Sequence, residues 1–325
     1  MSREPSHRKL TCNGVSLHIT EQGDGPLVLL LHGWPELSYS WRHQVPALAG
    51  AGWHVVAADM RGFGNSDAPE PVADYTVLHL VGDMVALVAA LGEREAVIVG
   101  HDWGASIAWT AALLRPDLFC AVAALSVPFR PRGPLPPLAA LRRAGLDRFY
   151  WIYFQEPGPA EAEFEADPVA TLRRILFSGS GDAPTREGLA LTLAESGGFL
   201  SRTIDPPALP SWLSAQDVEI MADAFRGTGF RGGLNYYRNL DRNWALLAPW
   251  QDARVRPPAL FIAGTRDVVI NSPIAAGWQE AMAAHVPNLR DTVLIEGGGH
   301  WIQQERPAEV NAALLRFLSE LPAPD

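Results

Sequence analysis

One aspartate in this sequence occupies a position where a nucleophile is expected. Asp102 is the centre of the segment Gly100-His-Asp-Trp-Gly104, which follows a short apolar run and precedes a helical pattern. Small residues two positions before and after it allow a strained, tight turn that lifts the central side chain to a sheet's edge. Serine is the usual occupant, but an aspartate has no hydroxyl to deprotonate and is already ionised at neutral pH. Its carboxylate would attack an electrophilic carbon directly.

The same five residues also fit a simpler arrangement. In that interpretation Asp102 only caps the helix that begins near Ala105, which is a common use of aspartate. The motif alone does not separate the two interpretations, so the surrounding residues must decide between them.

A base, and a group that orients it, are expected after two later strands. His300 follows the run Thr292–Glu296 through three glycines, and Asp267 follows the run Ala259–Ala263. Because the carboxyl ends of parallel strands meet at one edge of a sheet, both side chains should lie near Asp102. Considered singly, His300 could be a loop histidine without a catalytic role, and Asp267 could be a residue that only forms a turn. Three candidates after three strands, in the order nucleophile, acid, histidine, favour a catalytic triad.

The turn His32-Gly-Trp-Pro35 follows the first strong strand pattern and is the candidate for stabilising negative charge. Hydrolysis of an ester on Asp102 would place an oxyanion on its own Cγ. We expect the backbone N–H groups of Trp34 and Trp103 to bind that oxyanion. Pro35 restricts Trp34, and a cis peptide bond between them would fit a tight turn. An ordinary connection from strand to helix is the simpler interpretation of the turn.

The elements that must position these residues follow an alternating pattern. Short apolar runs alternate with helical patterns, which is typical of an α/β fold with a mostly parallel sheet flanked by helices. Residues at three- and four-residue spacing predict helices from Val77 to Leu91, from Ala105 to Leu114 and from Pro307 onwards. The expected strands are Leu27–Leu31, His54–Ala58, Ala96–Val99, Ala121–Ser126, Ala259–Ala263 and Thr292–Glu296.

The strand pattern is interrupted between roughly residues 128 and 243. A Pro-rich stretch opens this region, and helical patterns rich in Phe, Tyr and Trp follow it. A helical insertion between two sheet-forming halves is expected to cover a site at the carboxyl ends of the strands. We therefore divide the chain into a first core part at 1–130, a helical cap (lid) at 131–244 and a second core part at 245–325.

The composition argues against several classes of function. The 325 residues are 48% hydrophobic and 19% charged, as in globular proteins. A formal net charge of −10 disfavours nucleic acid and anionic membrane surfaces as partners. The N-terminus lacks the apolar core of a secretory signal and no apolar run is long enough to span a bilayer, so a cytoplasmic location is expected. Cys12 and Cys120 are expected to be reduced thiols, and the nine histidines form no metal-ligand cluster. The oligomeric state stays open.

Together these residues resemble the epoxide hydrolases of the α/β-hydrolase superfamily, over nearly the whole chain. The resemblance runs from the turn at residues 32–35 to Gly299-His-Trp301, and includes the turn at residues 59–66. Two segments of the insertion are the most specific. The segment 150–158 resembles the family segment with the first ring-opening tyrosine, at Tyr150, and 234–239 resembles the segment with the second, at Tyr237. Tyr153 and Tyr236 lie close by in the sequence, so this assignment rests on the resemblance.

The resemblance implies hydrolysis of an apolar epoxide, with water as the second substrate and with no metal or organic cofactor. Tyr150 and Tyr237 would hold the epoxide oxygen, because a tyrosine stays protonated at neutral pH and can donate to the departing oxygen. Asp102 would open the ring, and His300, oriented by Asp267, would activate the water that releases a vicinal diol. The substrate pocket is expected to include His32, Pro35, Phe129, Tyr153, Tyr236 and Trp301.

Two other functions would use the same residues. A haloalkane dehalogenase shares the nucleophile, the triad and the fold, but such enzymes often have Asn at the position of Trp34, and they have no obvious use for paired tyrosines. Halide release from a bromoalkane, without turnover of styrene oxide, would favour it. A non-catalytic ligand sensor would usually lack a catalytic residue, and this chain lacks none. A ligand that stabilises the protein without being converted would favour the sensor.

Overall fold

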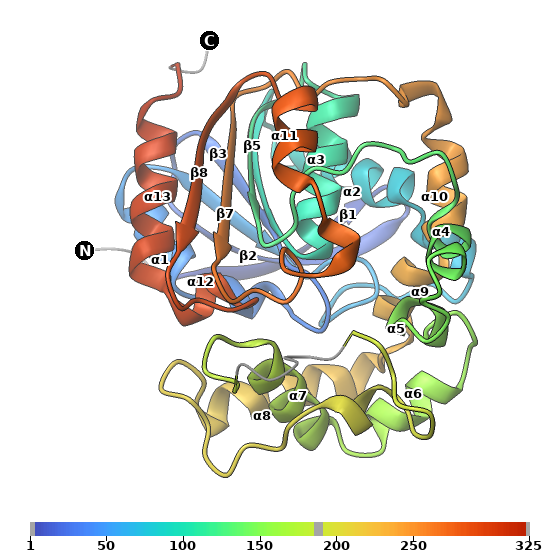
Figure 1. Ribbon diagram of the computed structural model, residues 1–325. Helices are drawn as coiled ribbons and strands as arrows, with labels where there is room; N and C mark the ends of the chain where they lie inside the picture. Colours follow the sequence, from blue (N-terminus) through green and yellow to red (C-terminus); the bar gives the residue numbers. More distant parts are fainter. Residues whose placement is uncertain (1–3, 185–190, 323–325) are drawn as a thin grey trace.

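A computed structural model gives the fold (Figure 1), and it describes residues 4–184 and 191–322. The parts of the three predicted domains that fall on residues 1–3, 185–190 and 323–325 lie outside the described residues.

Within the described residues the chain forms one eight-stranded sheet, in the order β1-β2-β4-β3-β5-β6-β7-β8. Its parallel strands are β3 (Leu27–Leu31), β4 (His54–Ala58), β5 (Ala96–His101), β6 (Phe119–Leu125), β7 (Ala259–Gly264) and β8 (Leu289–Ile295). All six were predicted, with ends that differ by up to three residues. The mostly parallel sheet flanked by helices that the sequence predicted is confirmed.

The sequence analysis missed β1 (Ser6–Cys12) and β2 (Val15–Gln22), an antiparallel hairpin at one edge of the sheet. β1 is solvent-exposed over most of its length, so it carries no apolar run. A signal was nevertheless present: the two strands are joined by Asn13-Gly14, both with positive φ, and Asn-Gly is the preferred two-residue hairpin turn.

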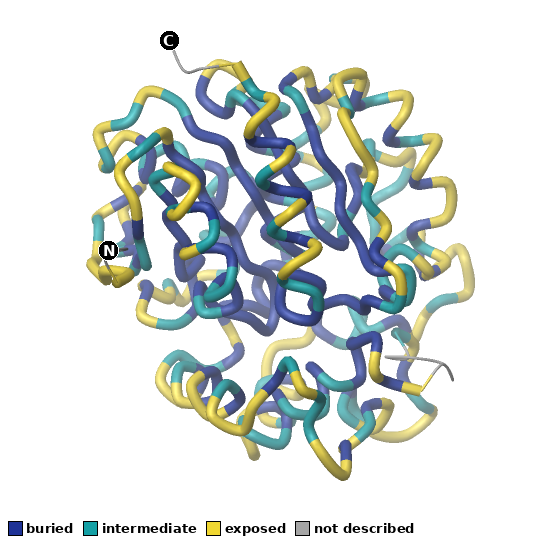
Figure 2. Tube along the Cα trace, turned by 90° about the vertical axis from the view of Figure 1, so that its left-hand side faces the viewer, coloured by how far each residue is buried: buried dark blue, intermediate teal, exposed yellow. Residues whose placement is uncertain are grey.

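Helices cover both faces of the sheet (Figure 1). One face packs on η1 (Ser38–Trp41), α1 (Gln44–Gly50), α12 (Ile302–Glu305) and α13 (Pro307–Ser319), and the other on α2 (Val77–Ala90), α3 (Trp103–Leu114) and α11 (Trp278–His285). Figure 2 shows the strands as a buried inner layer, with exposure on the outer sides of the helices. No helix within the described residues has the length and apolarity that a membrane crossing needs.

A long insertion joins β6 to β7, and its helices gather beyond the carboxyl ends of the strands (Figure 1). In its described part the regular structure is helical, apart from one bridge between Phe149 and Thr192. Its helices are α4 (Pro137–Arg143), α5 (Tyr150–Tyr153), α6 (Pro159–Glu165), α7 (Pro168–Gly179), η3 (Phe199–Arg202), α8 (Ala215–Thr228), α9 (Arg231–Arg238), α10 (Leu240–Leu246) and η4 (Ala248–Trp250).

Candidate active site

Asp102 lies between β5 and α3 with φ +52°, in the strained turn that the sequence predicted. The turn needs small neighbours, because a Cβ on Gly100 would lie 2.1 Å from the carbonyl oxygen of Gly104. A Cβ on Gly104 would meet the carbonyl oxygen of Leu31 at the same distance. Asp102 occupies the N-cap position of α3, but its side chain makes no capping hydrogen bond, so the carboxylate does not serve as the cap of this helix.

The carboxylate of Asp102 instead faces the turn after β3. The backbone N–H of Trp34 donates to Oδ1 of Asp102 at 2.9 Å. Gly33 permits this approach, since a Cβ on it would lie 2.3 Å from the Cβ of Asp102. The Trp34–Pro35 peptide bond is cis, as predicted. Of the two expected oxyanion donors, Trp34 contacts the carboxylate and Trp103 follows it as the first residue of α3.

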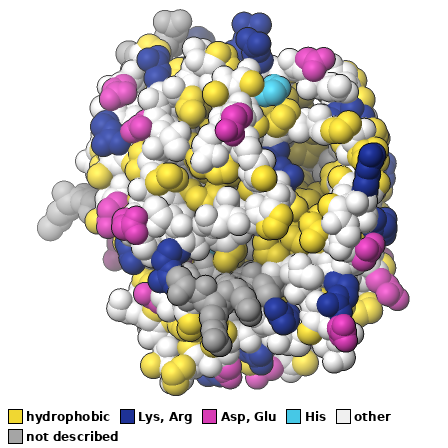
Figure 3. Space-filling model, in the orientation of Figure 1, with side chains coloured by type: hydrophobic (Ala, Val, Ile, Leu, Met, Phe, Trp, Pro, Cys, Tyr) yellow, Lys and Arg dark blue, Asp and Glu magenta, His cyan; other side chains and the backbone are white. Residues whose placement is uncertain are grey.

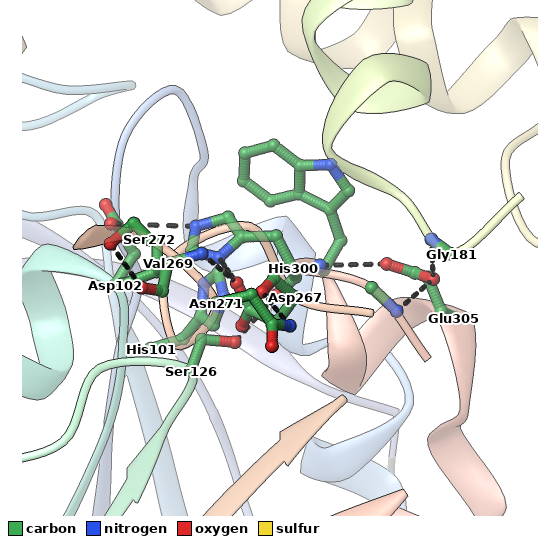
Figure 4. Close-up of polar contacts among 12 residues, drawn as sticks. His101, Asp102, Ser126, Gly181, Asp267, Val269, Asn271, Ser272, His300 and Glu305 are labelled. Carbon is green, nitrogen blue, oxygen red and sulfur yellow. Dashed lines mark hydrogen bonds and ion pairs between the residues drawn. The ribbon is translucent and has the colours of Figure 1, made fainter. Parts of the chain in front are cut away.

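The three residues predicted to form a triad meet at the ends of their strands (Figure 4). Nδ1 of His300 lies 3.0 Å from Oδ1 of Asp267, and Nε2 of His300 lies 3.6 Å from Oδ2 of Asp102. Asp267 is fully buried, and its Oδ1 also accepts the N–H of Val269 at 2.8 Å. These contacts place one ring nitrogen of His300 next to each carboxylate.

The charges around His300 favour its protonated form. Burial alone would lower the pKa of His300, but the carboxylates of Asp267 and Asp102 outweigh burial and hold that pKa well above its ordinary value. The two neighbouring carboxylates therefore stabilise the imidazolium form of His300.

Tyr150 and Tyr237 line the same cavity as Asp102, and their ring centroids are 5.6 Å apart. Burial, with the charge of Asp102 as a second cause, raises the pKa of Tyr150 above its ordinary value. Burial, followed by the neighbouring Tyr150 and Asp102, raises the pKa of Tyr237 in the same direction. Both phenols consequently remain protonated at neutral pH and retain a hydrogen to donate.

The other two tyrosines of these segments use their hydroxyls elsewhere. The hydroxyl of Tyr153 donates to Oε2 of Glu163 at 3.0 Å, and the hydroxyl of Tyr236 donates to the carbonyl oxygen of Arg61 at 2.9 Å. Neither lines the cavity that contains Asp102. The geometry therefore separates the two pairs that lie close together in the sequence.

The cavity itself has a volume of about 600 Å³ and lies between α3 and the insertion. Figure 3 shows a hollow in this face of the molecule with mostly hydrophobic side chains around it. Phe129 lines the cavity as predicted, and Asp102 is the only carboxylate among the described residues that line it. Helix α3 contributes a row of residues that sequence analysis did not assign to the pocket. These residues, one helical face at spacings of three and four, are Trp103, Ser106, Thr110 and Leu113.

Five residues expected in the pocket do not line this cavity, which corrects the prediction: His32, Pro35, Tyr153, Tyr236 and Trp301. The two tyrosines are described above. His32 is buried under the turn, where its Nε2 accepts the N–H of Met60 at 3.0 Å. Trp301 is buried, and its Nε1 donates to the carbonyl oxygen of Leu176 at 2.7 Å. Pro35 is buried inside the turn itself. Proximity in sequence to a reactive residue misled the prediction. Backbone partners hold the side chains of His32, Tyr236 and Trp301 away from the cavity, and the Glu163 carboxylate holds that of Tyr153.

Sequence analysis also missed a buried ion pair beneath the triad. Nδ1 of His101 lies 2.6 Å from Oε2 of Glu36, and its Nε2 donates to the carbonyl oxygen of His300 at 2.7 Å. Burial would raise the pKa of Glu36, but His101 outweighs burial and lowers that pKa to about 2. The ionised carboxylate only accepts hydrogen bonds, so both nitrogens of His101 donate. Both residues adjoin predicted site residues, at positions 35 and 102, which was the available signal.

A second buried carboxylate joins the loop of His300 to the insertion (Figure 4). Glu305 accepts the backbone N–H groups of Gly181, Gly299 and Trp301 at 2.8, 2.8 and 2.9 Å. The N–H of His300 donates to the carbonyl oxygen of Gly179 at 2.8 Å. The histidine loop is thus tied to the end of α7 directly, through the bond from His300 to Gly179, and indirectly, through the Glu305 carboxylate that also binds Gly181.

The fold and this arrangement of side chains define an α/β hydrolase with an aspartate in place of the usual serine. The sequence pattern of the alpha/beta hydrolase fold family matches residues 26–167. Epoxide hydrolase A of Mycobacterium tuberculosis is 47% identical to this chain over 98% of each chain. An epoxide hydrolase of Caballeronia sordidicola is 43% identical over 97% of this chain and 94% of its own.

Solved structures agree with these relatives. Epoxide hydrolase A from Mycobacterium thermoresistibile superposes with a TM-score of 0.92 at 44% identity, covering 98% of this chain and 100% of that one. An epoxide hydrolase from an endophytic Streptomyces gives 0.94 at 44% identity, covering 98% and 96%. The chain belongs to the epoxide hydrolase family, which confirms the resemblance recognised in the sequence.

Proposed function

We propose that this protein hydrolyses apolar epoxides to vicinal diols through a covalent ester on Asp102. The observation that carries the proposal is one cavity that contains the Asp102 carboxylate together with the protonated phenols of Tyr150 and Tyr237. The contacts of His300 with Asp102 and Asp267 support the second half of the reaction.

In the first half of the proposed reaction, the epoxide oxygen accepts hydrogen bonds from Tyr150 and Tyr237. The carboxylate of Asp102 attacks a ring carbon, so that a carbon–oxygen bond forms and the ring bond to the departing oxygen breaks. A phenol proton neutralises the developing alkoxide. The product of this half is a hydroxyalkyl ester of Asp102.

In the second half, the proton of His300 returns to the phenolate left by ring opening. The neutral imidazole then removes a proton from water, and the resulting hydroxide attacks Cγ of Asp102. Ester formation prepares this step, because it removes the charge of Asp102 and so lowers the pKa of His300 towards its ordinary value. Asp267 keeps the imidazole oriented. The N–H groups of Trp34 and Trp103 stabilise the tetrahedral oxyanion, and the ester then collapses to release the diol.

We also propose that residues 131–244 act as a cap, since this segment contributes both tyrosines and much of the cavity wall. No step of the proposed mechanism uses a metal or an organic cofactor.

The route of oxygen tests the covalent step. In a single turnover of styrene oxide in H₂¹⁸O, with enzyme in excess, we expect the diol to contain no heavy oxygen, because its new oxygen comes from Asp102. In later turnovers the diol should carry label, and mass spectrometry should find it in the peptide that contains Asp102. Heavy oxygen in the diol of the first turnover would mean direct attack by water and would refute the ester.

Removal of the phenol hydroxyls tests the ring-opening step. Tyr150→Phe and Tyr237→Phe should each slow ester formation by about a hundredfold, and the double variant by about 10⁴-fold, as expected for loss of an acid catalyst. Rapid-quench mass spectrometry of the alkylated protein measures that rate.

Tyr153→Phe and Tyr236→Phe are the matched controls, since they remove hydroxyls bound to Glu163 and to the Arg61 carbonyl. Both should form the ester within a few-fold of the wild-type rate, with at most about 1 kcal/mol lost in the free energy of unfolding. If Tyr153→Phe and Tyr236→Phe slowed ester formation more than Tyr150→Phe and Tyr237→Phe did, the role of proton donor would pass to Tyr153 and Tyr236.

A further inference from the structure

The two tyrosines that line the cavity belong to helices too short to fix their own positions. Tyr150 begins α5, a single turn of four residues, and Tyr237 lies in the last turn of α9, which has eight residues. Helices of this length gain little stability from their own hydrogen bonds, so contacts with the rest of the protein determine where they lie. The spacing of the two phenols therefore depends on how α5 and α9 are joined.

Gln155, just after α5, joins the two helices through its side-chain amide. Its Nε2 donates to the carbonyl oxygen of Trp151 in α5 at 2.7 Å and to the carbonyl oxygen of Tyr237 in α9 at 3.0 Å. Carbonyl groups in the last turn of a helix lack a partner within it, so the Tyr237 carbonyl can accept this bond without the loss of one inside α9. One amide group thus binds the backbone of Tyr237 and of the residue that follows Tyr150.

Arg238, the last residue of α9, makes the same kind of link in the opposite direction. Its Nε donates to the carbonyl oxygen of Phe154 at 3.0 Å, and its Nη2 donates to the carbonyl oxygen of Glu156 at 3.2 Å. The same Nη2 lies 2.7 Å from Oε1 of Glu161, and the side chain of Arg238 is only 4% exposed. Each tyrosine segment therefore contributes a side chain that binds the backbone of the other.

The ring of Phe154 packs against both tyrosine rings. Its centroid lies 5.3 Å from that of Tyr150 and 5.0 Å from that of Tyr237, and Phe154 is fully buried. The carbonyl group of the same residue accepts the bond from Arg238. The bonds between the two backbones are thus continuous with the packing that sets the distance between the tyrosine rings.

The start of α5 is held by a different part of the insertion. The N–H of Tyr150 donates to the carbonyl oxygen of Leu191 at 2.8 Å, and the N–H of Leu193 donates to the carbonyl oxygen of Arg148 at 2.8 Å. These bonds fix the start of the helix. The bonds of Gln155 and Arg238 fix its end against α9.

The spacing matters because an epoxide has a single oxygen atom. Both phenols must point at the same place to donate to that atom together. A displacement of about 1 Å at a reacting group can cost about a hundredfold in rate. A phenol displaced in this way would remain protonated but would no longer reach the oxygen.

We infer that Gln155 and Arg238 are positioning residues, which hold α5 against α9 so that the hydroxyls of Tyr150 and Tyr237 converge on one oxygen. The inference rests on the proposed epoxide hydrolysis and adds two residues to its ring-opening step. Gln155 and Arg238 are not among the described residues that line the cavity, so they act through the two tyrosines. Ester hydrolysis, which uses His300, does not depend on them.

The first test separates ring opening from ester hydrolysis in Gln155→Met, which keeps a side chain of similar size and removes its donors. Rapid-quench mass spectrometry should show that ester formation from styrene oxide slows by about tenfold, as expected for two acids that no longer converge. Decay of the ester after removal of excess substrate should stay within about twofold of the wild-type rate, because that step uses other groups. An unchanged rate of ester formation would overturn the inference.

Arg238→Gln should slow ester formation in the same way. Arg238→Lys should recover part of the rate, because an ammonium group can still donate to one of the two carbonyl oxygens. The control is Arg226→Gln, which removes an exposed arginine of α8 that is paired with Glu219, and it should form the ester at the wild-type rate. An equal loss in Arg226→Gln and Arg238→Gln would count against the inference.

A double-mutant cycle distinguishes positioning from a general loss of structure in the insertion. When Tyr237→Phe is already present, only one phenol remains and convergence is no longer required. Addition of Gln155→Met should then slow ester formation by less than about twofold. A loss of about tenfold in both backgrounds would mean that Gln155 only supports the fold of the insertion, and the inference would fall.

A binding measurement needs no turnover. The carbonyl oxygen of phenylacetamide can accept both phenol hydroxyls, and this amide has no ring to open. In an NMR titration, wild type should bind it about tenfold more tightly than Gln155→Met, the value of roughly one hydrogen bond. Equal affinities would overturn the inference. Tighter binding by a wild type that forms no ester would instead support the positioning and count against the proposed hydrolysis.

Discussion

Replacement of His300 by Gln is expected to arrest the reaction at the covalent ester. Asp102 attacks without help from a base, so ring opening continues, but glutamine cannot take a proton from the hydrolytic water. Steady-state turnover should fall by about 10⁴-fold or more, as it does when the base of a triad is removed. After incubation with styrene oxide, the intact protein should gain the mass of one substrate molecule. Peptide mapping should place that mass on Asp102.

His7→Gln is the matched control for this experiment. His7 lies in the exposed strand β1, so its substitution should leave both turnover and the unmodified mass unchanged. A His300→Gln variant that is inactive and unmodified would show that His300 is already needed for formation of the ester. Turnover near the wild-type rate would exclude it as the base.

Replacement of Asp102 by Ala should have the largest effect of all. Loss of the nucleophile removes the covalent route, and the expected fall in kcat is on the order of a millionfold. Diol formation measured by chromatography tests the loss, and circular dichroism shows whether the variant is folded. No covalent adduct should form, even when His300→Gln is added to the same chain.

Asp24→Ala, which removes an exposed carboxylate far from the triad in the sequence, is the control for charge. It should retain wild-type turnover. Substantial activity in the Asp102→Ala variant would end the proposal, because no other carboxylate among the described residues lines the cavity.

The parallel strands and the triad were predictable from the sequence for the same reason. β5 and β7 are buried over their whole length and therefore read as continuous apolar runs, whereas the edge strand β8 is exposed over most of its length. Each triad residue follows one of these three strands within five residues. The strand ends then place Asp102, Asp267 and His300 together without knowledge of any side-chain contact. The exposed strand β1 has no such run, and only its Asn13-Gly14 turn marks it.

The cavity wall was much less predictable. Tyr236 and Tyr237 are adjacent on α9, yet one donates to the Arg61 carbonyl and the other lines the cavity. Consecutive residues on a helix point in directions about 100° apart, so packing of the whole helix decides which of them faces the substrate. The Glu36–His101 pair is hidden for a related reason, since its partners are 65 residues apart in sequence.

The link through Glu305 has a consequence for the passage of substrate and product. If the insertion swung away from the core at the end of α7, the carboxylate of Glu305 would lose its bond to Gly181, or the histidine loop would move with it. Either event would disturb the alignment of His300 with Asp102. We therefore expect the α7 side of the insertion to stay fixed to the core while substrate and product pass.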